Sequence, residues 1–411
     1  MSTALSVFLN QDRVGRLWLD SARRLVFQYD PAWLGQQHAA PLSLSLPLRP
    51  EPYAEDTARP FFANLLPEAE VRHKLARQLG LSERNDYGLL EIIGGDCAGA
   101  VSLLPEGALP TDSGEYRLLT EEKLHDIVTR LPTRPLLAGE EGVRLSLAGA
   151  QDKLPVYVDN GQVFLPLGAY PSSHILKTPI RDVIGTVENE AYCLALAARL
   201  DIAVPAAWVR RGQDRLYLVE RFDRQRNTQG HLVRLHQEDF CQALGVPPEM
   251  KYEKEGGPSL RLCAQLIRQH SLRPAADLKA LLGWVIFNYL IGNADAHGKN
   301  LSFLLMAEGV SLAPFYDLLC TAVYPHLTDS LAMRIGDEDR PAWVNREQWE
   351  RLAADLDIKP KLVLSTLETM ATSLSEAAAA LAFLDETGIV RGIRKTIADR
   401  SRKVLALLAS R

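Results

Sequence analysis

The sequence has no long apolar run. The longest such stretch near the C-terminus, Ala377 to Leu384, is far too short to cross a bilayer. The N-terminus also lacks the basic start and continuous apolar segment of a secretory signal, because Asn10 to Arg13 interrupt its apolar residues. Both absences argue against a membrane or secreted protein and predict a cytoplasmic one without membrane contact.

Cysteine is scarce and the net charge is small. The five cysteines are scattered and form no C-x-x-C pair, which predicts reduced thiols in a cytosol. The net charge of -5 excludes a generalised coat for nucleic acid and leaves only local basic patches as possible contacts. With 411 residues, of which 47% are hydrophobic and 24% are charged, the chain is expected to be globular, with two or three domains.

The glycine clusters contain no standard phosphate loop. The cluster Gly94–Ala100 is followed by a strand-like stretch and no helix, so we interpret it as a tight connection. The stretch Ser146–Lys153 is neither a G-x-G-x-x-G nor a Walker loop, yet its small residues let backbone N–H groups approach phosphate, and Lys153 adds a positive charge. A plain β-turn is the alternative interpretation of this second loop.

The most informative stretch is the polar loop Gly292–Asn300, which directly follows the apolar run Leu281–Ile291. It places Asp295 five positions before Asn300, which is the spacing of the kinase catalytic loop. Asp317 follows seventeen residues later, where a kinase has a further metal ligand. Chance often produces an Asp and an Asn at this spacing, because both favour turns. Other parts of a kinase must therefore occur in the right order.

Three such parts precede the loop. Lys177 lies on an apolar strand-like stretch; such a lysine is usually solvated, but a kinase needs one there for the α- and β-phosphates. Glu190 lies at the edge of the apolar face of a helix expected from Thr186 to about Leu200, and is the candidate ion-pair partner of Lys177. The stretch Leu216–Arg224 is either the hinge that binds adenine or an ordinary edge strand.

The secondary-structure pattern changes along the chain. Residues 4–30 alternate apolar and polar and predict a small antiparallel sheet, and one helix is expected from Phe61 to about Gln78. Pro105–Glu115 has the composition of a linker. After Gln237 sheet signals largely vanish, and the helices expected are Glu238–Leu244, Leu260–His270, Ala276–Ile291, Arg346–Asp355, Lys361–Leu384 and Val390–Leu408.

This pattern predicts an α+β protein with a two-lobed protein-kinase-like fold. Residues 1–105 would form a small β-rich accessory domain with helices, 112–222 the kinase small lobe, and 223–411 an all-helical large lobe. The stretch Thr387–Arg411 has seven basic residues against one acidic residue, which we interpret as a solvated helix face rather than a patch for nucleic acid or a partner.

The candidate parts follow one another in kinase order between residues 146 and 317. We therefore expect phosphoryl transfer from ATP. Asp295 would accept the proton of the attacking hydroxyl, Asn300 and Asp317 would hold Mg²⁺, and Lys177 would orient the α- and β-phosphates.

The chain also resembles the HipA-type serine/threonine kinase toxins of bacterial toxin–antitoxin modules over nearly its full length. The motifs that carry the resemblance are, in order, PFFANLLPE, GGDCAGAV, LSLAGAQDK, HILKTPI, VENE, VERFDR, QEDFCQALG, KYEKEGGP, IGNADAHGKN and FYDLL. So many motifs in the order of the family make the resemblance specific.

The resemblance implies roles for individual residues. Asp295 would be the catalytic base, Asn300 and Asp317 the Mg²⁺ ligands, and Ser146 the serine that such kinases autophosphorylate. A dianionic phosphoserine would not suit a small buried loop, so phosphorylation is expected to disorder the phosphate cradle and switch the enzyme off. The residues implied at the nucleotide are Ala148, Gly149, Ala150, Gln151, Asp152, Lys153, Lys177, Glu220, Arg221, Phe222, His297, Gly298, Lys299, Asn300, Tyr316, Asp317, Leu318 and Leu319.

The resemblance further implies partners. Family members act on aminoacyl-tRNA synthetases, notably the glutamyl enzyme, and are neutralised by a small helix-turn-helix antitoxin of the HipB type, with which they bind operator DNA. Two features depart from familiar patterns. Ala294 stands where many protein kinases have arginine, so activation through an arginine–phosphate contact is not expected. The segment Gly336–Arg340 is net acidic, which leaves DNA binding mainly to the partner.

Two other function classes stay open. The chain could be a catalytically silent corepressor that only docks an antitoxin, although the intact Asp295, Asn300, Asp317 and Lys177 count against it. A small-molecule phosphotransferase is also consistent with a helical large lobe that has Ala294 in place of the kinase arginine. Such an enzyme would transfer phosphate to sugars or antibiotics. Labelled ATP with Mg²⁺ separates these classes, because a docking protein would show neither self-labelling nor transfer.

Overall fold

The computed structural model describes residues 4–111, 113–139, 143–149 and 151–409. The chain forms two compact units. The first unit comprises Met1–Thr178, Arg210–Glu249 and Leu304–Glu308, and the second comprises Pro179–Val209, Met250–Phe303 and Gly309–Arg411. Each unit therefore combines segments that are distant in the sequence.

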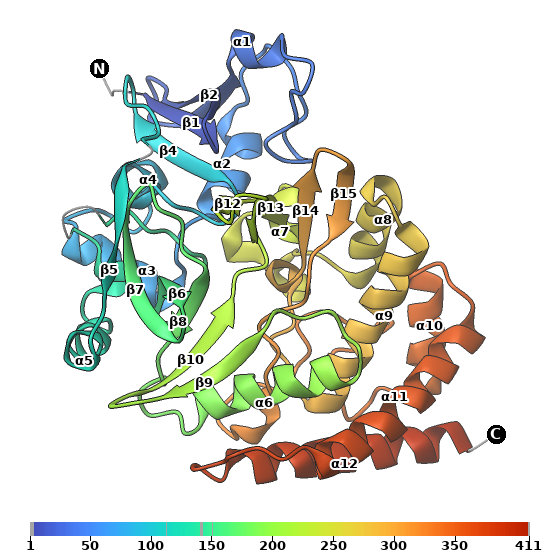
Figure 1. Cartoon of the computed structure of the whole chain (residues 1–411). Helices are drawn as coiled ribbons and strands as arrows, with labels where there is room; N and C mark the ends of the chain where they lie inside the picture. The colour runs from blue at the N-terminus through green and yellow to red at the C-terminus, as the bar shows by residue number, and fades with distance from the viewer. Residues whose placement is uncertain (1–3, 112, 140–142, 150, 410–411) are drawn as a thin grey trace. The chain divides into compact units, whose positions relative to one another are not determined.

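The first unit begins with a four-stranded antiparallel sheet (Figure 1). Its strands, β1 (Leu5–Leu9), β2 (Asp12–Leu19), β3 (Leu25–Tyr29) and β4 (Val101–Pro105), lie in the order β3-β2-β1-β4. The antiparallel pairing of the first three strands confirms the small sheet predicted for residues 4–30.

The single helix predicted from Phe61 to Gln78 is wrong, because the structure has two helices there. The helices near the sheet are α1 (Pro31–Leu34), α2 (Glu55–Ala63), α3 (Ala69–Gln78) and α4 (Asp86–Ile93). The side-chain amide of Asn64 donates to the carbonyl of Pro60 at 2.7 Å, just where α2 ends. Pro67 has no N–H to donate and disfavours helical backbone at the residue before it, so the helix cannot continue.

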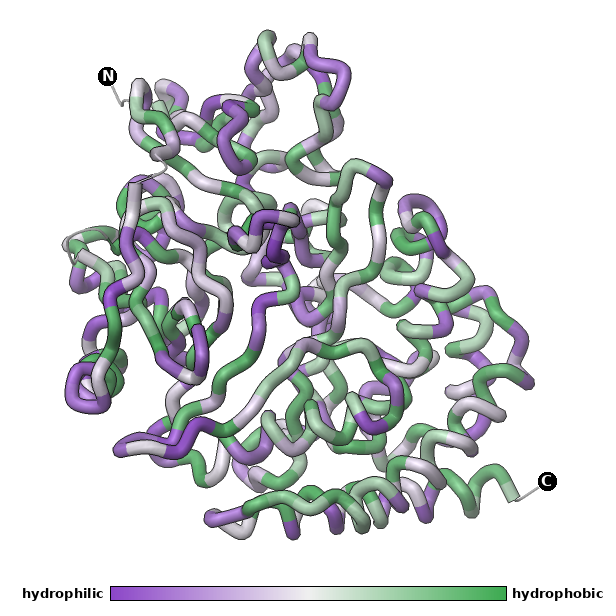
Figure 2. The backbone as a smooth tube through the Cα atoms, viewed as in Figure 1, coloured by the Kyte–Doolittle hydropathy of each residue, from purple (hydrophilic) through white to green (hydrophobic). Residues whose placement is uncertain are grey.

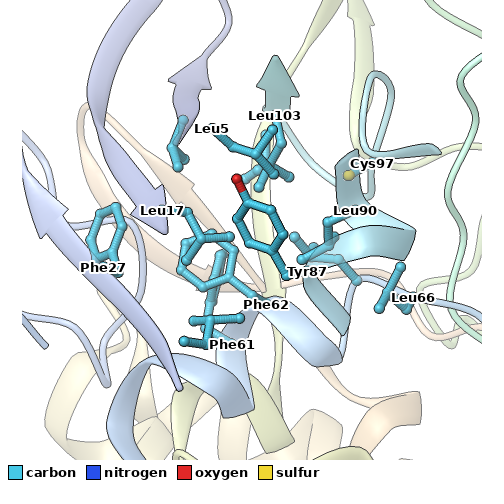
Figure 3. Packing of buried hydrophobic residues seen from close by; sticks show 14 of the residues in the cluster. Leu5, Leu17, Phe27, Phe61, Phe62, Leu66, Tyr87, Leu90, Cys97 and Leu103 are labelled. Carbon is cyan, nitrogen blue, oxygen red and sulfur yellow. The ribbon is translucent and has the colours of Figure 1, made fainter. Parts of the chain in front are cut away.

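Aromatic side chains of α2 fill the core of this part of the first unit. Phe61 and Phe62 are fully buried, with ring centroids 5.2 Å apart, and the Phe62 ring lies 5.3 Å from that of Phe27 on β3. Figure 3 shows these rings among Leu17 of β2 and Tyr87 of α4. The PFFANLLPE motif therefore supplies core packing for the sheet.

A second antiparallel sheet of the first unit contains the strand order β5-β7-β6-β8-β10. Its strands are β5 (Gly114–Leu118), β6 (Lys153–Asp159), β7 (Gln162–Gly168), β8 (His174–Lys177) and β10 (Arg215–Glu220). Further elements are α5 (Glu121–Arg130), η1 (Pro135–Leu137), β9 (Ala207–Arg211), β11 (Arg224–Arg226), β12 (Leu232–Arg234), β13 (His236–Asp239), α7 (Phe240–Ala243) and η2 (Pro248–Met250). Strand β8, which lies between β6 and β10, ends at Lys177.

The second unit is built mainly from helices. They are α6 (Thr186–Arg199), α8 (Leu260–His270), α9 (Pro274–Ile291), α10 (Arg346–Asp355), α11 (Pro360–Ala380) and α12 (Ile389–Ala409). These bounds confirm the predicted helices to within a few residues, and with the sheets they confirm the α+β class. The short strands β14 (Ser302–Met306) and β15 (Gly309–Leu312) were not predicted, and Glu238–Leu244 is a strand end followed by the one-turn helix α7.

The predicted solvated face of α12 is wrong for two of its basic residues, which are partly buried. Arg394 Nη2 donates to the carbonyl of Leu381 at 2.7 Å, where α11 ends, and Arg400 donates to the carbonyl of Tyr289 near the end of α9. Burial lowers the pKa of Arg400. Lys403 is exposed, and its Nζ donates to the carbonyl of Ala342 at 2.5 Å. Hydrophilic and hydrophobic residues alternate along the helix in Figure 2. The two arginines therefore satisfy carbonyls near the ends of α11 and α9 inside the second unit.

No helix in the described ranges is both long and apolar enough to cross a membrane. All five cysteines are buried free thiols, and burial raises the pKa of Cys97 to about 12. Such a thiol stays protonated and unreactive at neutral pH.

Glu238 of β13 is a fully buried carboxyl group in the first unit. One of its oxygens lies 2.5 Å from Ser43 Oγ, and the other accepts the N–H of Leu44 at 3.0 Å. Burial raises the pKa of Glu238 to about 8 from its ordinary value of 4.5. Between these two pH values the folded protein retains a proton that the unfolded chain has released.

We expect the first unit to lose stability as the pH rises from 5 to 8, by up to about 1.4 kcal/mol per pH unit. The sign follows because the folded state binds more protons than the unfolded state in this window. Glu238→Gln should flatten the dependence, since a neutral amide can make both contacts. Urea midpoints of the two proteins across this pH range test the prediction, and parallel curves would contradict it.

Candidate active site

The loop after α9 is shaped by side-chain hydrogen bonds to its own backbone. Thr321 Oγ1 accepts the N–H of Ala294 at 2.8 Å and donates to the carbonyl of Gly292 at 3.0 Å. Asn293 Oδ1 accepts the N–H of Asp295 at 3.0 Å. The Asp295 carboxylate is thereby presented from a fixed backbone, and its side chain is 47% exposed.

Asn300 and Asp317 come together in the second unit. Asn300 Nδ2 lies 3.4 Å from Asp317 Oδ2, and Asn300 Oδ1 accepts the N–H of His297 at 3.1 Å. Asn300 ends the short turn η4 (Gly298–Asn300). Asp317 has a φ of 52°, in the left-handed region that non-glycine residues rarely adopt. Such strain persists only where the surroundings impose it, and it gathers at functional sites.

The segment around Asp317 is held from two directions. Asn189 of α6 forms two hydrogen bonds with the backbone of Cys320, donating to its carbonyl at 2.9 Å and accepting its N–H at 2.8 Å. Tyr316 Oη donates to the carbonyl of Lys299 at 2.6 Å. The predicted metal ligands are therefore anchored to each other's segments and to α6.

The pair formed by Asn300 and Asp317 suits Mg²⁺ by its chemistry. Mg²⁺ prefers oxygen ligands and is usually held by one or two carboxylates together with substrate phosphates. In the part of the chain that the structure describes, no cluster of three or more His, Cys, Asp or Glu residues could hold a metal. A cation at this pair would therefore depend on the nucleotide for further ligands, and the amide oxygen of Asn300 would have to turn away from His297 toward it.

In the first unit, two lysines lie side by side near the small-residue loop. Lys153 on β6 is the cross-strand partner of Lys177 on β8, and opposed residues project from the same face of a sheet. Lys177 is only 7% exposed, and Lys153 Nζ donates to the carbonyl of Ala148. Gln151 Nε2 donates to the carbonyl of Thr178 at 2.8 Å, which ties the loop to the end of β8.

Not every predicted residue is placed by these contacts. Ala150 lies outside the described residues. Lys177 and Glu190 belong to different units and are both buried, and their ion pair stays a prediction. The guanidinium of Arg221 is buried and pairs with Asp223 at 2.7 Å. An adenine at the predicted segment Glu220–Phe222 would therefore contact backbone groups and not the guanidinium of Arg221.

Ser146 is fully buried in the first unit. Its Oγ donates to the carbonyl of Leu65 at 2.7 Å, and its N–H donates to the carbonyl of Asp96 at 2.9 Å. These contacts link the serine to two segments of the N-terminal part of the chain.

Two family profiles match this chain: the HipA N-terminal domain over residues 5–104 and the HipA-like C-terminal domain over residues 145–378. The chain belongs to the HipA family. The protein Y4mE of Sinorhizobium fredii is 45% identical over 91% of each chain. The serine/threonine-protein kinase toxin HipA of Shewanella oneidensis is 32% identical, covering 99% of this chain and 98% of the toxin.

Structural similarity extends over the same length. The solved HipA of Shewanella oneidensis, in complex with HipB and its operator DNA, matches with a TM-score of 0.85 and 30% identity over 98% of each chain. Membership of the HipA family makes this chain a serine/threonine kinase of α+β fold, as the order of its motifs predicted.

Sequence reasoning missed three residues that hold the candidate site in place. Asn189 and Tyr252 lie within the motifs VENE and KYEKEGGP, but motif order does not tell which member of a motif turns inward. Thr321 lies outside every motif that was recognised. Only the folded geometry shows that these three side chains contact Cys320, Asp295 and Ala294, in the segments of the predicted base and metal ligands.

Proposed function

We propose that this chain is the toxin of a bacterial toxin–antitoxin module, an ATP- and Mg²⁺-dependent kinase acting in the cytoplasm on a serine or threonine of a protein. The observation that carries this proposal is the gathering of Asp295, Asn300 and Asp317 in adjoining loops of the second unit, with the latter two 3.4 Å apart. Similarity to the toxin HipA over 99% of the chain supports the toxin role. The target we propose is an aminoacyl-tRNA synthetase, the glutamyl enzyme first.

Each candidate residue has a role in this proposal. Asp295 accepts the proton of the attacking hydroxyl. The oxygen of that hydroxyl forms a bond to the γ-phosphorus while the bond between the γ-phosphorus and ADP breaks. Asn300 and Asp317 would hold Mg²⁺, which would supply charge stabilisation at the phosphates. Lys177 orients the α- and β-phosphates and pairs with Glu190.

The remaining assignments rest on the family resemblance. The nucleotide is bounded by Ala148–Lys153 over the phosphates, by Glu220–Phe222 at the adenine, and by His297–Lys299, Tyr316, Leu318 and Leu319. The division into an accessory domain at 1–105, a small lobe at 112–222 and a large lobe at 223–411 belongs to the same proposal.

We also propose a helix-turn-helix antitoxin as the partner, with operator DNA bound through it. The support is the HipA of Shewanella oneidensis, which was solved with HipB and its operator DNA. A short reading frame beside this gene that encodes a helix-turn-helix protein is expected. Co-purification of the two proteins, with retention of the upstream DNA, tests the assignment; a neighbouring product that binds neither would contradict it.

Ser146 is the proposed site of self-inactivation. Its hydroxyl is buried and donates to the Leu65 carbonyl, so a phosphoryl group cannot be accommodated without moving the segment. The phosphate loop begins two residues later, at Ala148. Ejection of this segment would remove the backbone over the phosphates and stop further transfer.

Incubation with ATP and Mg²⁺ should add one phosphate to Ser146, and Ser146→Ala should prevent that addition and prolong activity. Ser401→Ala is the matched control, because Ser401 is another buried serine, in α12 of the second unit. Mass spectrometry locates the phosphate. Equal labelling of Ser146→Ala and wild type would contradict the proposal, and no labelling or transfer at all would favour the silent docking protein.

A further inference from the structure

A tyrosine from a separate segment of the second unit reaches the carboxylate of Asp295. Tyr252 Oη donates to Asp295 Oδ1 at 2.6 Å, across 43 residues of sequence. Tyr252 immediately precedes the short turn η3 (Glu253–Glu255) in the polar KYEKEGGP segment. No role for this segment followed from the sequence beyond its place among the family motifs.

The tyrosine is held against the catalytic loop by backbone hydrogen bonds. Ala332 joins the two segments, because its N–H donates to the carbonyl of Ala294 at 3.0 Å and its carbonyl accepts the N–H of Glu253 at 3.0 Å. The Tyr252 ring also packs edge-on against His297, with ring centroids 5.3 Å apart. Ala294 and Glu253 directly adjoin the base and the tyrosine, so this strap fixes the distance between them.

The hydrogen bond restricts the orientation of the carboxylate. Asn293 already holds the Asp295 N–H, which fixes the backbone, while the bond at Oδ1 fixes the side-chain torsion and leaves Oδ2 for the acceptor hydroxyl. The phenol is neutral and donates one proton, so it orients the base without adding a charge. A base displaced by about 1 Å loses on the order of 100-fold in rate.

We propose that Tyr252 is a positioning residue that holds Asp295 in the orientation needed for proton transfer from the acceptor hydroxyl. This proposal rests on the proposed role of Asp295 as the base. Tyr252 does not take part in the chemistry, and its hydroxyl keeps its proton throughout.

The test isolates the hydroxyl. Tyr252→Phe keeps the ring, and with it the contact to His297 and the neighbouring Lys251 and Lys254, whose ammonium groups lie 5.3 and 5.8 Å from the ring centroid. The matched control is Tyr192→Phe, which removes a tyrosine hydroxyl that donates to the carbonyl of Ala378 at 2.9 Å in the same unit. Asp295→Asn reports on the base itself.

Phosphate transfer is measured as ADP release from Mg²⁺-ATP, which counts every acceptor, including water. For Tyr252→Phe we expect kcat to fall by about 10- to 100-fold, with KM for ATP changed by less than about twofold. Tyr192→Phe should keep the wild-type kcat. Because a purely structural tyrosine would not separate kcat from KM, this split identifies positioning. Tyr252→Phe combined with Asp295→Asn should be no slower than Asp295→Asn alone.

Four results would overturn the proposal. If Asp295→Asn is inactive and Tyr252→Phe has the wild-type kcat, Tyr252 has no positioning role while the base assignment stands. If Tyr252→Phe is faster than wild type, the Tyr252 hydroxyl blocks the position of the acceptor. If phosphate is found on Tyr252, the tyrosine is itself an acceptor and not a positioning residue. If Asp295→Asn retains full activity, the base assignment fails and the positioning role with it.

Discussion

Asp295→Asn is expected to lower phosphate transfer by at least about 100-fold while leaving the fold intact. A carboxamide can accept the Tyr252 hydrogen bond, but it cannot take up the proton of the attacking hydroxyl. The backbone of the loop does not depend on this side chain, because Asn293 and Thr321 hold the N–H groups of Asp295 and Ala294. Loss of activity without loss of stability is therefore the expected outcome.

The measurement is the initial rate of ADP release at saturating Mg²⁺-ATP, with thermal unfolding recorded alongside. Asp357→Asn is the matched control, since Asp357 lies on the surface of the same unit with its side chain 86% exposed. It has a φ of 48°, a conformation that asparagine tolerates well. A residual rate above about one part in a hundred in Asp295→Asn would contradict its role as base.

Asp96→Asn is expected to cause the largest loss of stability, about 3–5 kcal/mol. Asp96 is buried in the first unit, where Oδ1 binds Arg234 Nε at 3.0 Å and Arg224 Nη2 at 3.2 Å, and Oδ2 lies 4.0 Å from Arg221 Nη1. Burial would raise the pKa of Asp96, but the three guanidinium groups together hold it below its ordinary value. Neutralising Asp96 leaves Asp223 as the only carboxylate paired with the buried Arg221 and Arg224 in the described structure.

Denaturant unfolding of Asp96→Asn tests this prediction, with Asp20→Ala as control because its pairing with Arg24 is exposed. Adding Arg224→Met to Asp96→Asn restores the charge balance of the cluster, so the double variant should be more stable than Asp96→Asn. If Asp96→Asn alone is as stable as wild type, the stability of the cluster does not depend on Asp96. The backbone carbonyl of Asp96 also accepts the N–H of Ser146, so self-phosphorylation of the variant is worth recording.

The sequence predicted the long elements well because their patterns are local. The helices α8 and α10 begin and end at the predicted residues, and the side chain of Ser259 caps the first turn of α8. The single helix predicted from Phe61 to Gln78 was wrong because the apolar spacing continues across Pro67. The effect of this proline on the backbone outweighs the apolar spacing, and the chain forms two helices. The short strands β14 and β15 were missed because strands of four and five residues carry little pattern.

The proposed roles of Asp295, Asn300 and Asp317 rest on their spacing, which is visible in the sequence. The residues that hold these three in place could not be predicted. Asn189 and Tyr252 act through contacts across more than 40 residues, and any polar residue in their segments would have looked equally suitable. The basic residues of α12 show the same limit, because their carbonyl partners come from other helices.

The most direct test of the account is a crystal structure of the chain with a non-hydrolysable ATP analogue and Mg²⁺. We expect the Lys177 ammonium to contact an α- or β-phosphate oxygen, and one cation to be bound by the side-chain oxygens of Asn300 and Asp317. A nucleotide bound away from Lys177, or a cation that neither Asn300 nor Asp317 contacts, would contradict the proposed phosphate-transfer site.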